Sequence, residues 1–195
     1  MMVGIALGTE LPLSPMQLLW INLLSDIFPG LALSMEPAEP EVMRRPPRDP
    51  SERIVTRSAL LQMGRESLII TGGALASLGY GLWRYGPGPV SGTLAFQTLT
   101  TAQLLHALSC RSPESVLWGE RQRPANPYLR AALIGSLALQ LLTLVVPGLR
   151  RLLGTQPLGL LDLGVVAATA GLPLLINEAL KPGQAPRHCP PETPP

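Results

Sequence analysis

Three polar side chains lie close together within an otherwise apolar stretch, and their oxygens could bind a cation. Asn22 and Asp26 are four residues apart, which places them one turn apart on the same helix face, with Ser25 beside them. Placing a carboxylate at mid-membrane depth costs at least about 2.5 kcal/mol of insertion free energy. This cost makes a functional role the favoured interpretation of Asp26. Carboxylate and amide oxygens suit calcium, magnesium or manganese. The alternative is that Asp26 only hydrogen-bonds a neighbouring helix.

A proline follows this group and predicts a break in the helix that carries it. Pro29 lacks the amide hydrogen that would bond the carbonyl of Ser25, and its ring pushes against that carbonyl. With Gly30 beside it, we expect the helix to kink or unwind near Pro29. A freed carbonyl would then lie next to Asp26. Irregular backbone of this kind is tolerated at membrane depth where it lines a cavity or is covered by protein.

The elements that must position these residues are long apolar segments. Hydrophobic residues make up 46% of the 195 residues and charged residues 14%, whereas a soluble domain has about a quarter charged. Runs of roughly 18 or more apolar residues span a bilayer. We count five such spans, over residues 15–35, 59–83, 92–110, 128–149 and 158–180. The fold class predicted is an all-α membrane protein, a bundle of about five transmembrane helices with the first kinked or unwound near Pro29.

Basic residues are distributed unevenly between the two sides of this predicted bundle. The richer side holds Arg44, Arg45, Arg48, Arg53, Arg57, Arg65, Arg111, Arg121, Arg123, Arg130, Lys181 and Arg187. The other side holds Arg84, Arg150 and Arg151. The positive-inside rule places the richer side in the cytoplasm, which predicts a multi-pass protein with a cytoplasmic C-terminus. The lipid bilayer is thus the first expected partner, and a net charge of +2 gives no indication of nucleic acid.

Three segments are expected along the chain. Residues 1–14 form an apolar piece too short to cross a bilayer, interpreted as the remnant of a preceding transmembrane helix and its outer loop. Residues 15–181 form the transmembrane domain. Residues 182–195 are proline-rich and are expected to be a disordered cytoplasmic tail. His188 and Cys189 lie in that tail, where a solvated role is favoured over a metal site.

Several short motifs follow one another in fixed order between residues 17 and 50: QLLWINLLSD, a proline, ALSMEP and VMRRPPRDP. This region resembles the sixth transmembrane helix and following loop of type II P-type ATPases, the sarcoplasmic-reticulum calcium pump group and its bacterial relatives. The rest of the chain is similar, more loosely, to the seventh to tenth helices. In that family the positions matching Asn22, Ser25 and Asp26 supply cation ligands. The resemblance therefore implies that role here, in a bacterial-type inner (plasma) membrane.

The third span carries two weaker candidates for the same site. Its run TTAQLLHAL, residues 100–108, resembles the eighth helix, in which two-site calcium pumps have an acidic ligand at the place of Gln103. Glutamine offers an oxygen without a charge, which argues against a second calcium site. His106, three residues on, could face the same pathway or be a hydrogen-bonded residue of the bundle. Four other polar residues are interpreted as interfacial or interhelical groups: Arg65, Glu66, Asn177 and Glu178.

The family's chemistry is phosphoryl transfer from ATP to an aspartate, and the motifs for it are absent from this sequence. Neither DKTGT nor an actuator TGE occurs, so the chain alone is not expected to be catalytic or to hold a cofactor. The resemblance implies an N-terminal catalytic part as partner, which would bind ATP and magnesium. We therefore predict a membrane-domain fragment or split subunit that contributes to the intramembrane site for ATP-driven transport of a calcium-like divalent cation.

Two other interpretations remain open at this point. The chain could be a stand-alone membrane interaction or assembly protein that has the pump's C-terminal fold and no transport of its own. It could also be a small secondary transporter or channel built on a broken helix and a midplane carboxylate. The absence of an inverted repeat in the sequence weighs against the transporter.

Overall fold

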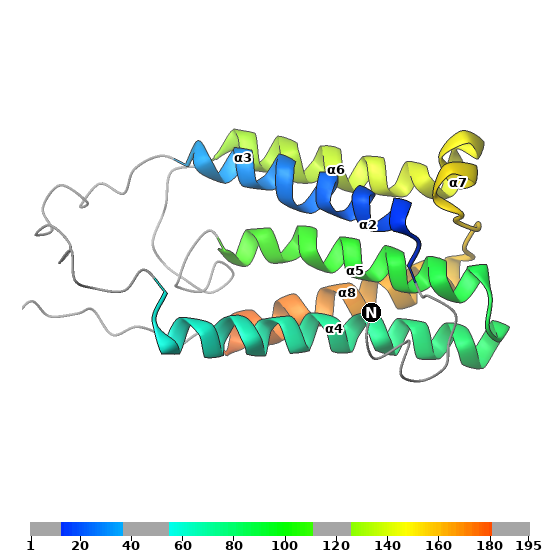
Figure 1. Cartoon of the computed structure of the whole chain (residues 1–195), viewed down its shortest axis with the longest axis horizontal. Coiled ribbons are helices and arrows are strands. Elements are labelled where there is room, and N and C mark those ends of the chain that lie inside the picture. Colours follow the sequence, from blue (N-terminus) through cyan, green and yellow to red (C-terminus); the bar gives the residue numbers. More distant parts are fainter. Residues whose placement is uncertain (1–12, 37–54, 111–125, 181–195) are drawn as a thin grey trace, which may run out of the picture.

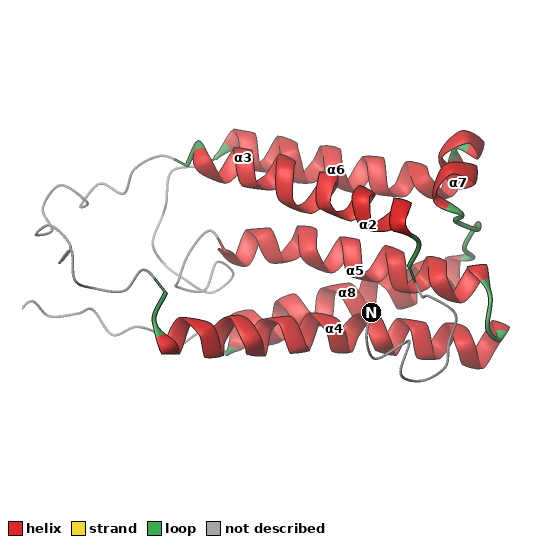
Figure 2. Cartoon of the chain, in the orientation of Figure 1, coloured by secondary structure: helices red, strands yellow, loops and turns green. Residues whose placement is uncertain are grey.

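The computed structural model describes residues 13–36, 55–110 and 126–180. All regular secondary structure in these ranges is helical, as Figure 2 shows, which confirms the all-α class. The predicted helix remnant at the N-terminus, the proline-rich loop over residues 37–54 and the C-terminal tail lie outside the described residues.

The first predicted span is one continuous helix with a change of winding in its middle. It consists of α2 (Pro15–Asn22), the π-helical turn η1 (Leu23–Ile27) and α3 (Phe28–Ser34). Ser14 caps its start through a reciprocal pair of hydrogen bonds with Gln17. The irregularity falls just before Pro29, as predicted. It takes the form of a π turn, in which backbone bonds shift from four to five residues, and the helix does not unwind.

Five further helices follow in the described residues, and local chemistry fixes several of their ends. The second span is α4 (Arg57–Tyr85), which the Thr56 side chain caps and which ends at Gly86 with a φ of 74°. The third is α5 (Pro89–Cys110) and the last is α8 (Leu160–Ala179). The fourth predicted span, 128–149, is divided into α6 (Pro127–Val145) and the short α7 (Pro147–Leu153). Val146 is extended because the following proline disfavours helical backbone at that residue.

Three of these helices are long and apolar enough to cross a membrane: Pro15–Ser34, Pro127–Val145 and Leu160–Ala179. The helices α4 and α5 have 29 and 22 residues, so they are also long enough. They carry more polar side chains. In α5 nearly all side chains are buried or half-buried, and polar residues of membrane helices face the bundle interior.

The helix α5 lies in the middle of the bundle, and the other helices pack around it (Figure 1). It contacts α4 and α8 on one side and α6 and η1 on the other. Each of the three buried apolar clusters includes a residue of α5, namely Phe96, Ala102 or Leu104. We call the end of the bundle where α3 and α5 end and α4 and α6 begin the arginine-rich end, after the loops that follow it in sequence.

Candidate functional site

A cavity of about 440 Å³ lies between the first helix, α4 and α5. Apolar residues from all three elements form part of its wall, including Leu33, Met63 and Leu99. The remaining wall is polar and consists of Ser25, Asp26, Glu66, Ser67, Thr71, Gln103 and His106. The π turn, α4 and α5 thus each direct oxygen-bearing side chains at one space.

The π turn contributes Ser25 and Asp26. The Ser25 hydroxyl donates to the backbone carbonyl of Ile21 at 2.8 Å and lies 3.0 Å from Oδ1 of Asp26. Pro29 and Gly30 line the cavity immediately beyond them. The Asp26 carboxylate is exposed within this chain, and its one hydrogen bond is to a serine on the same turn. A carboxylate in this position is open to a cation on its cavity side.

Asn22, the third predicted ligand of the first span, does not line the cavity with Ser25 and Asp26. Asn22 is exposed and is not among the residues that line the cavity. A π turn holds more residues per turn than an α-helix, so the turn between Asn22 and Asp26 rotates the two positions relative to their α-helical arrangement. The structure therefore brings four of the five sequence-predicted residues to one cavity, and Asn22 is the exception.

Both weaker candidates on α5 line the cavity, and each has a buried polar atom without a hydrogen-bond partner. These atoms are Oε1 of Gln103 and Nδ1 of His106. A buried polar atom left unpaired costs about 1–3 kcal/mol, and such atoms in a native structure call for an explanation such as a ligand or an ion. The α5 wall of the cavity therefore carries two buried polar atoms that a ligand, an ion or water would satisfy.

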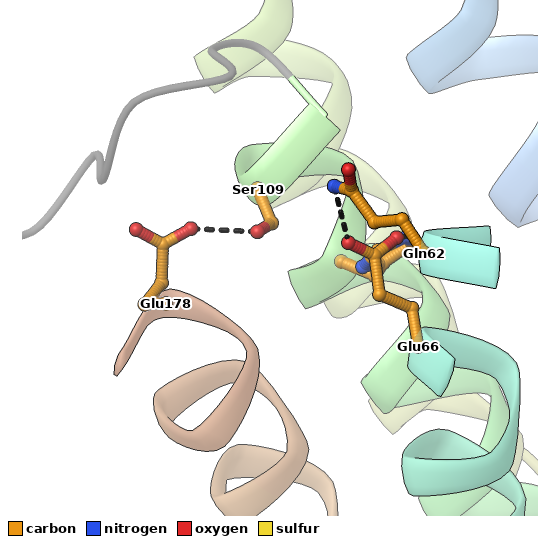
Figure 3. A network of polar contacts seen from close by, with 5 residues as sticks. Gln62, Glu66, Ser109 and Glu178 are labelled. Carbon is orange, nitrogen blue, oxygen red and sulfur yellow. Dashed lines mark hydrogen bonds and ion pairs between the residues drawn. The ribbon is translucent and has the colours of Figure 1, made fainter. Parts of the chain in front are cut away.

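The wall formed by α4 includes a carboxylate that the sequence led us to interpret as an interfacial or interhelical group. Glu66 lines the cavity, and its side chain is only 12% exposed. Gln62 donates to Oε1 of Glu66 at 2.9 Å, and Nε2 of His106 lies 3.6 Å from Oε2. Figure 3 shows the Gln62–Glu66 pair on α4. The signal that could have found Glu66 was a carboxylate about two and a half turns inside a helix of membrane-spanning length.

A second polar pair near the arginine-rich end lies away from the cavity. Ser109 of α5 donates to Oε1 of Glu178 on α8 at 2.6 Å, as Figure 3 shows. Glu178 is thus an interhelical polar group, as expected. Its neighbour Asn177 is 1% exposed, and both of its side-chain polar atoms lack a partner. Neither residue lines the cavity.

The first helix is held from its other side by hydrogen bonds to α6. The Trp20 indole donates to Oε1 of Gln140 at 2.9 Å, and the Ser136 hydroxyl donates to the carbonyl of Leu24 at 3.3 Å. At the arginine-rich end, the amide of Asn126 donates to the carbonyl of Ala32 at 3.0 Å. These bonds fix α2, η1 and α3 against α6 at three levels, which orients the cavity-facing side of the π turn toward α4 and α5.

The chemistry of the cavity suits a hard cation better than a soft one. Among the described residues there is no group of three or more His, Cys, Asp and Glu side chains that could hold a resident metal ion. The polar wall supplies two carboxylates, three hydroxyls and an amide, which are oxygen donors of the type that calcium and magnesium prefer. One imidazole accompanies them.

Comparison with known proteins gives a consistent result along most of the chain. Residues 10–182 match the family model described as cation transporting ATPase, C-terminus. A mouse protein named calcium-transporting ATPase type 2C member 2 is 32% identical over 175 residues, covering 87% of this chain and 18% of that protein. The calcium-transporting ATPase of Bacillus subtilis is 32% identical over 180 residues, covering 90% and 20%. The chain spans about a fifth of the length of these relatives.

Proposed function

The chain belongs to the cation-transporting ATPases as a C-terminal membrane region, and from this membership we propose that it forms part of the cation-binding site of an ATP-driven pump. The substrate is a divalent cation of the calcium type, with manganese and magnesium as the other ions that suit the donors. A catalytic part binds ATP and magnesium and is phosphorylated. The assembly lies in a bacterial-type inner membrane with the arginine-rich end in the cytoplasm.

The observation that carries this proposal is the position of Asp26 on a π turn at the wall of a polar cavity. A carboxylate at membrane depth is unfavourable unless it has a partner. Its hydrogen bond to Ser25 leaves the charge uncompensated. A divalent cation in the cavity, held by Asp26 with Ser25 and Gln103, offsets that charge and gives the unpaired oxygen of Gln103 a partner.

The π turn also supplies a means of switching the site. A segment with π hydrogen bonding next to a proline can exchange with other local windings at small energetic cost, because Pro29 has no amide hydrogen to lose. Phosphorylation in the catalytic part would bias the tilt and winding of this helix, which changes the distance between Asp26 and α5 and so the affinity for the cation.

The test is to reconstitute the chain with the N-terminal part of a calcium-transporting ATPase and to measure cation-stimulated ATP hydrolysis. We expect Asp26→Asn to raise the calcium concentration for half-stimulation by more than about tenfold, since even outer partners of metal ligands contribute 10- to 100-fold in affinity. Glu178→Gln is the matched control, because this carboxylate lies outside the cavity. Stimulated activity that is equal in Asp26→Asn and wild type contradicts the assignment.

The same experiment separates the pump from an assembly role. A stand-alone interaction protein would co-purify with the catalytic part and leave its cation dependence unchanged. A site-forming region would make stimulation by calcium depend on its presence and on Asp26.

A further inference from the structure

The cavity contains a second carboxylate, Glu66, on a helix that none of the predicted ligands occupies. Resting on the proposed function, we propose that Glu66 contacts the transported cation together with Asp26, so that α4 forms part of the cation site. The observations are the placement of Glu66 in the cavity, its depth in the bundle, its incomplete charge compensation and the unpaired atoms beside it.

Depth along the helices places the oxygen donors at one level. At a rise of about 1.5 Å per residue, Asp26 lies about 12 Å from the end of α3 at Ser34. Glu66 lies about 13 Å from the start of α4 at Arg57. Gln103 lies about 10 Å from the end of α5. All three ends belong to the arginine-rich end of the bundle (Figure 1). The three residues therefore lie at similar depth on different helices, and all three line the cavity.

The burial of Glu66 argues against an interfacial role. An interfacial glutamate extends toward water, whereas this side chain is 12% exposed and is held along the cavity wall by Gln62 and His106. Gln62 is neutral, and the imidazole compensates the charge only when it is protonated. Among the described residues no Lys or Arg side chain pairs with Glu66. The largely buried carboxylate therefore has no permanent counter-charge among the described residues.

Two carboxylates on one cavity wall repel each other unless something positive lies between them. Asp26 of the π turn and Glu66 of α4 both line this cavity, and so does Gln103 of α5. A buried charge is costly when unpaired, and a divalent cation offsets both charges at once. The unpaired Oε1 of Gln103 fits the same occupant, because an amide oxygen is a ligand that a divalent cation binds.

The test uses the chain reconstituted with the N-terminal part of a calcium-transporting ATPase in lipid nanodiscs, with calcium as the probe. Dicyclohexylcarbodiimide modifies carboxyl groups in apolar surroundings, and mass spectrometry reads the modification at each residue separately. We expect calcium to reduce the labelling of Asp26 and Glu66 together, while Glu178 is labelled equally with and without it. Calcium binding by equilibrium dialysis should weaken by at least about tenfold in Glu66→Gln and by less than about twofold in Glu178→Gln.

The outcomes separate this inference from the proposed function. Protection of Asp26 with unchanged labelling of Glu66, or equal affinities of Glu66→Gln and Glu178→Gln, overturns the role of Glu66 and leaves the proposed function standing. Protection of Glu66 alone places α4 in the cation site but overturns the shared contact with Asp26, and it contradicts the assignment of Asp26. Protection of neither, with calcium, manganese or magnesium, overturns both. Circular dichroism of Glu66→Gln verifies that the helices are retained.

Discussion

The contact between α4 and α8 depends on a glycine without a side chain, and adding one methyl group there should weaken the bundle. A Cβ built on Gly73 lies closer than 3.0 Å to the backbone oxygen of Thr169 and 3.1 Å from Cγ of Pro173. Pro173 has no amide hydrogen for the carbonyl of Thr169, four residues earlier, so that oxygen faces α4. A backbone atom cannot rotate away as a side chain can, and the two helices must separate.

The neighbouring Gly72 provides a matched control for the size of the effect. A Cβ on Gly72 has no atom within 4 Å, so alanine there adds no clash. Overpacking a well-packed contact costs about 1–3 kcal/mol, which is the expected loss of unfolding free energy for Gly73→Ala. Gly72→Ala should be neutral or stabilising by up to about 1 kcal/mol, since alanine is the better helix former.

The assay is reversible unfolding of the full chain in mixed lipid–detergent micelles with increasing SDS, followed by far-ultraviolet circular dichroism and tryptophan fluorescence. Both variants replace glycine by alanine in adjacent positions of one helix, so their difference isolates the contact with α8. Unfolding free energies that agree within about 0.5 kcal/mol would refute the packing argument, because surface substitutions already vary by that amount.

Two further variants test how α6 holds the first helix. Trp20→Phe removes the donor to Oε1 of Gln140, a residue that is 1% exposed. Because a buried acceptor loses its partner, the unfolding free energy in the same assay should fall by about 1–3 kcal/mol. A change in the fluorescence signal without a change in unfolding free energy would contradict this expectation. Asn126→Ala removes the cap of α6 and the bonds to Ala32 and Glu36 and should cost about 1–2 kcal/mol. Asn126→Ser keeps a capping oxygen, so its smaller loss measures the two bonds to Ala32 and Glu36 together.

The helices were predictable because their signals are local. Long apolar runs marked a helix at each of the five predicted spans, and three of these helices are long and apolar enough to cross a membrane. Pro29 marked the irregular turn that precedes it. The form of that turn was not predictable, because a proline only removes a hydrogen bond, and packing against α6 decides how the backbone adjusts. The break at Val146 was not predicted, because the apolar run continues through Val146 and Pro147. The proline is nevertheless a local signal for a helix end at the preceding residue.

The candidate site was predictable on the first helix and α5 but not on α4. Asp26 and Ser25 belong to one motif, and Gln103 and His106 to another. Glu66 follows an arginine near the start of its span, a pattern that also fits an interfacial residue. Which face of α4 meets α5 depends on contacts distant in sequence, such as the one between Gly73 and α8. Only the assembled bundle shows that Glu66 lies on the cavity side.

The polar contacts of the first helix are divided unequally between its two sides, and this division bears on how a cation site could switch. Toward α6, donors and acceptors are paired at Trp20, Leu24 and Ala32. Toward α4 and α5, the cavity holds carboxylates without permanent counter-charges and unpaired polar atoms. Under the proposed function, a cation would add its binding energy on the cavity side alone. Binding would then draw the π turn toward α4 and α5, while the hydrogen bonds to α6 hold the opposite side, and the backbone next to Pro29 is the part that would move.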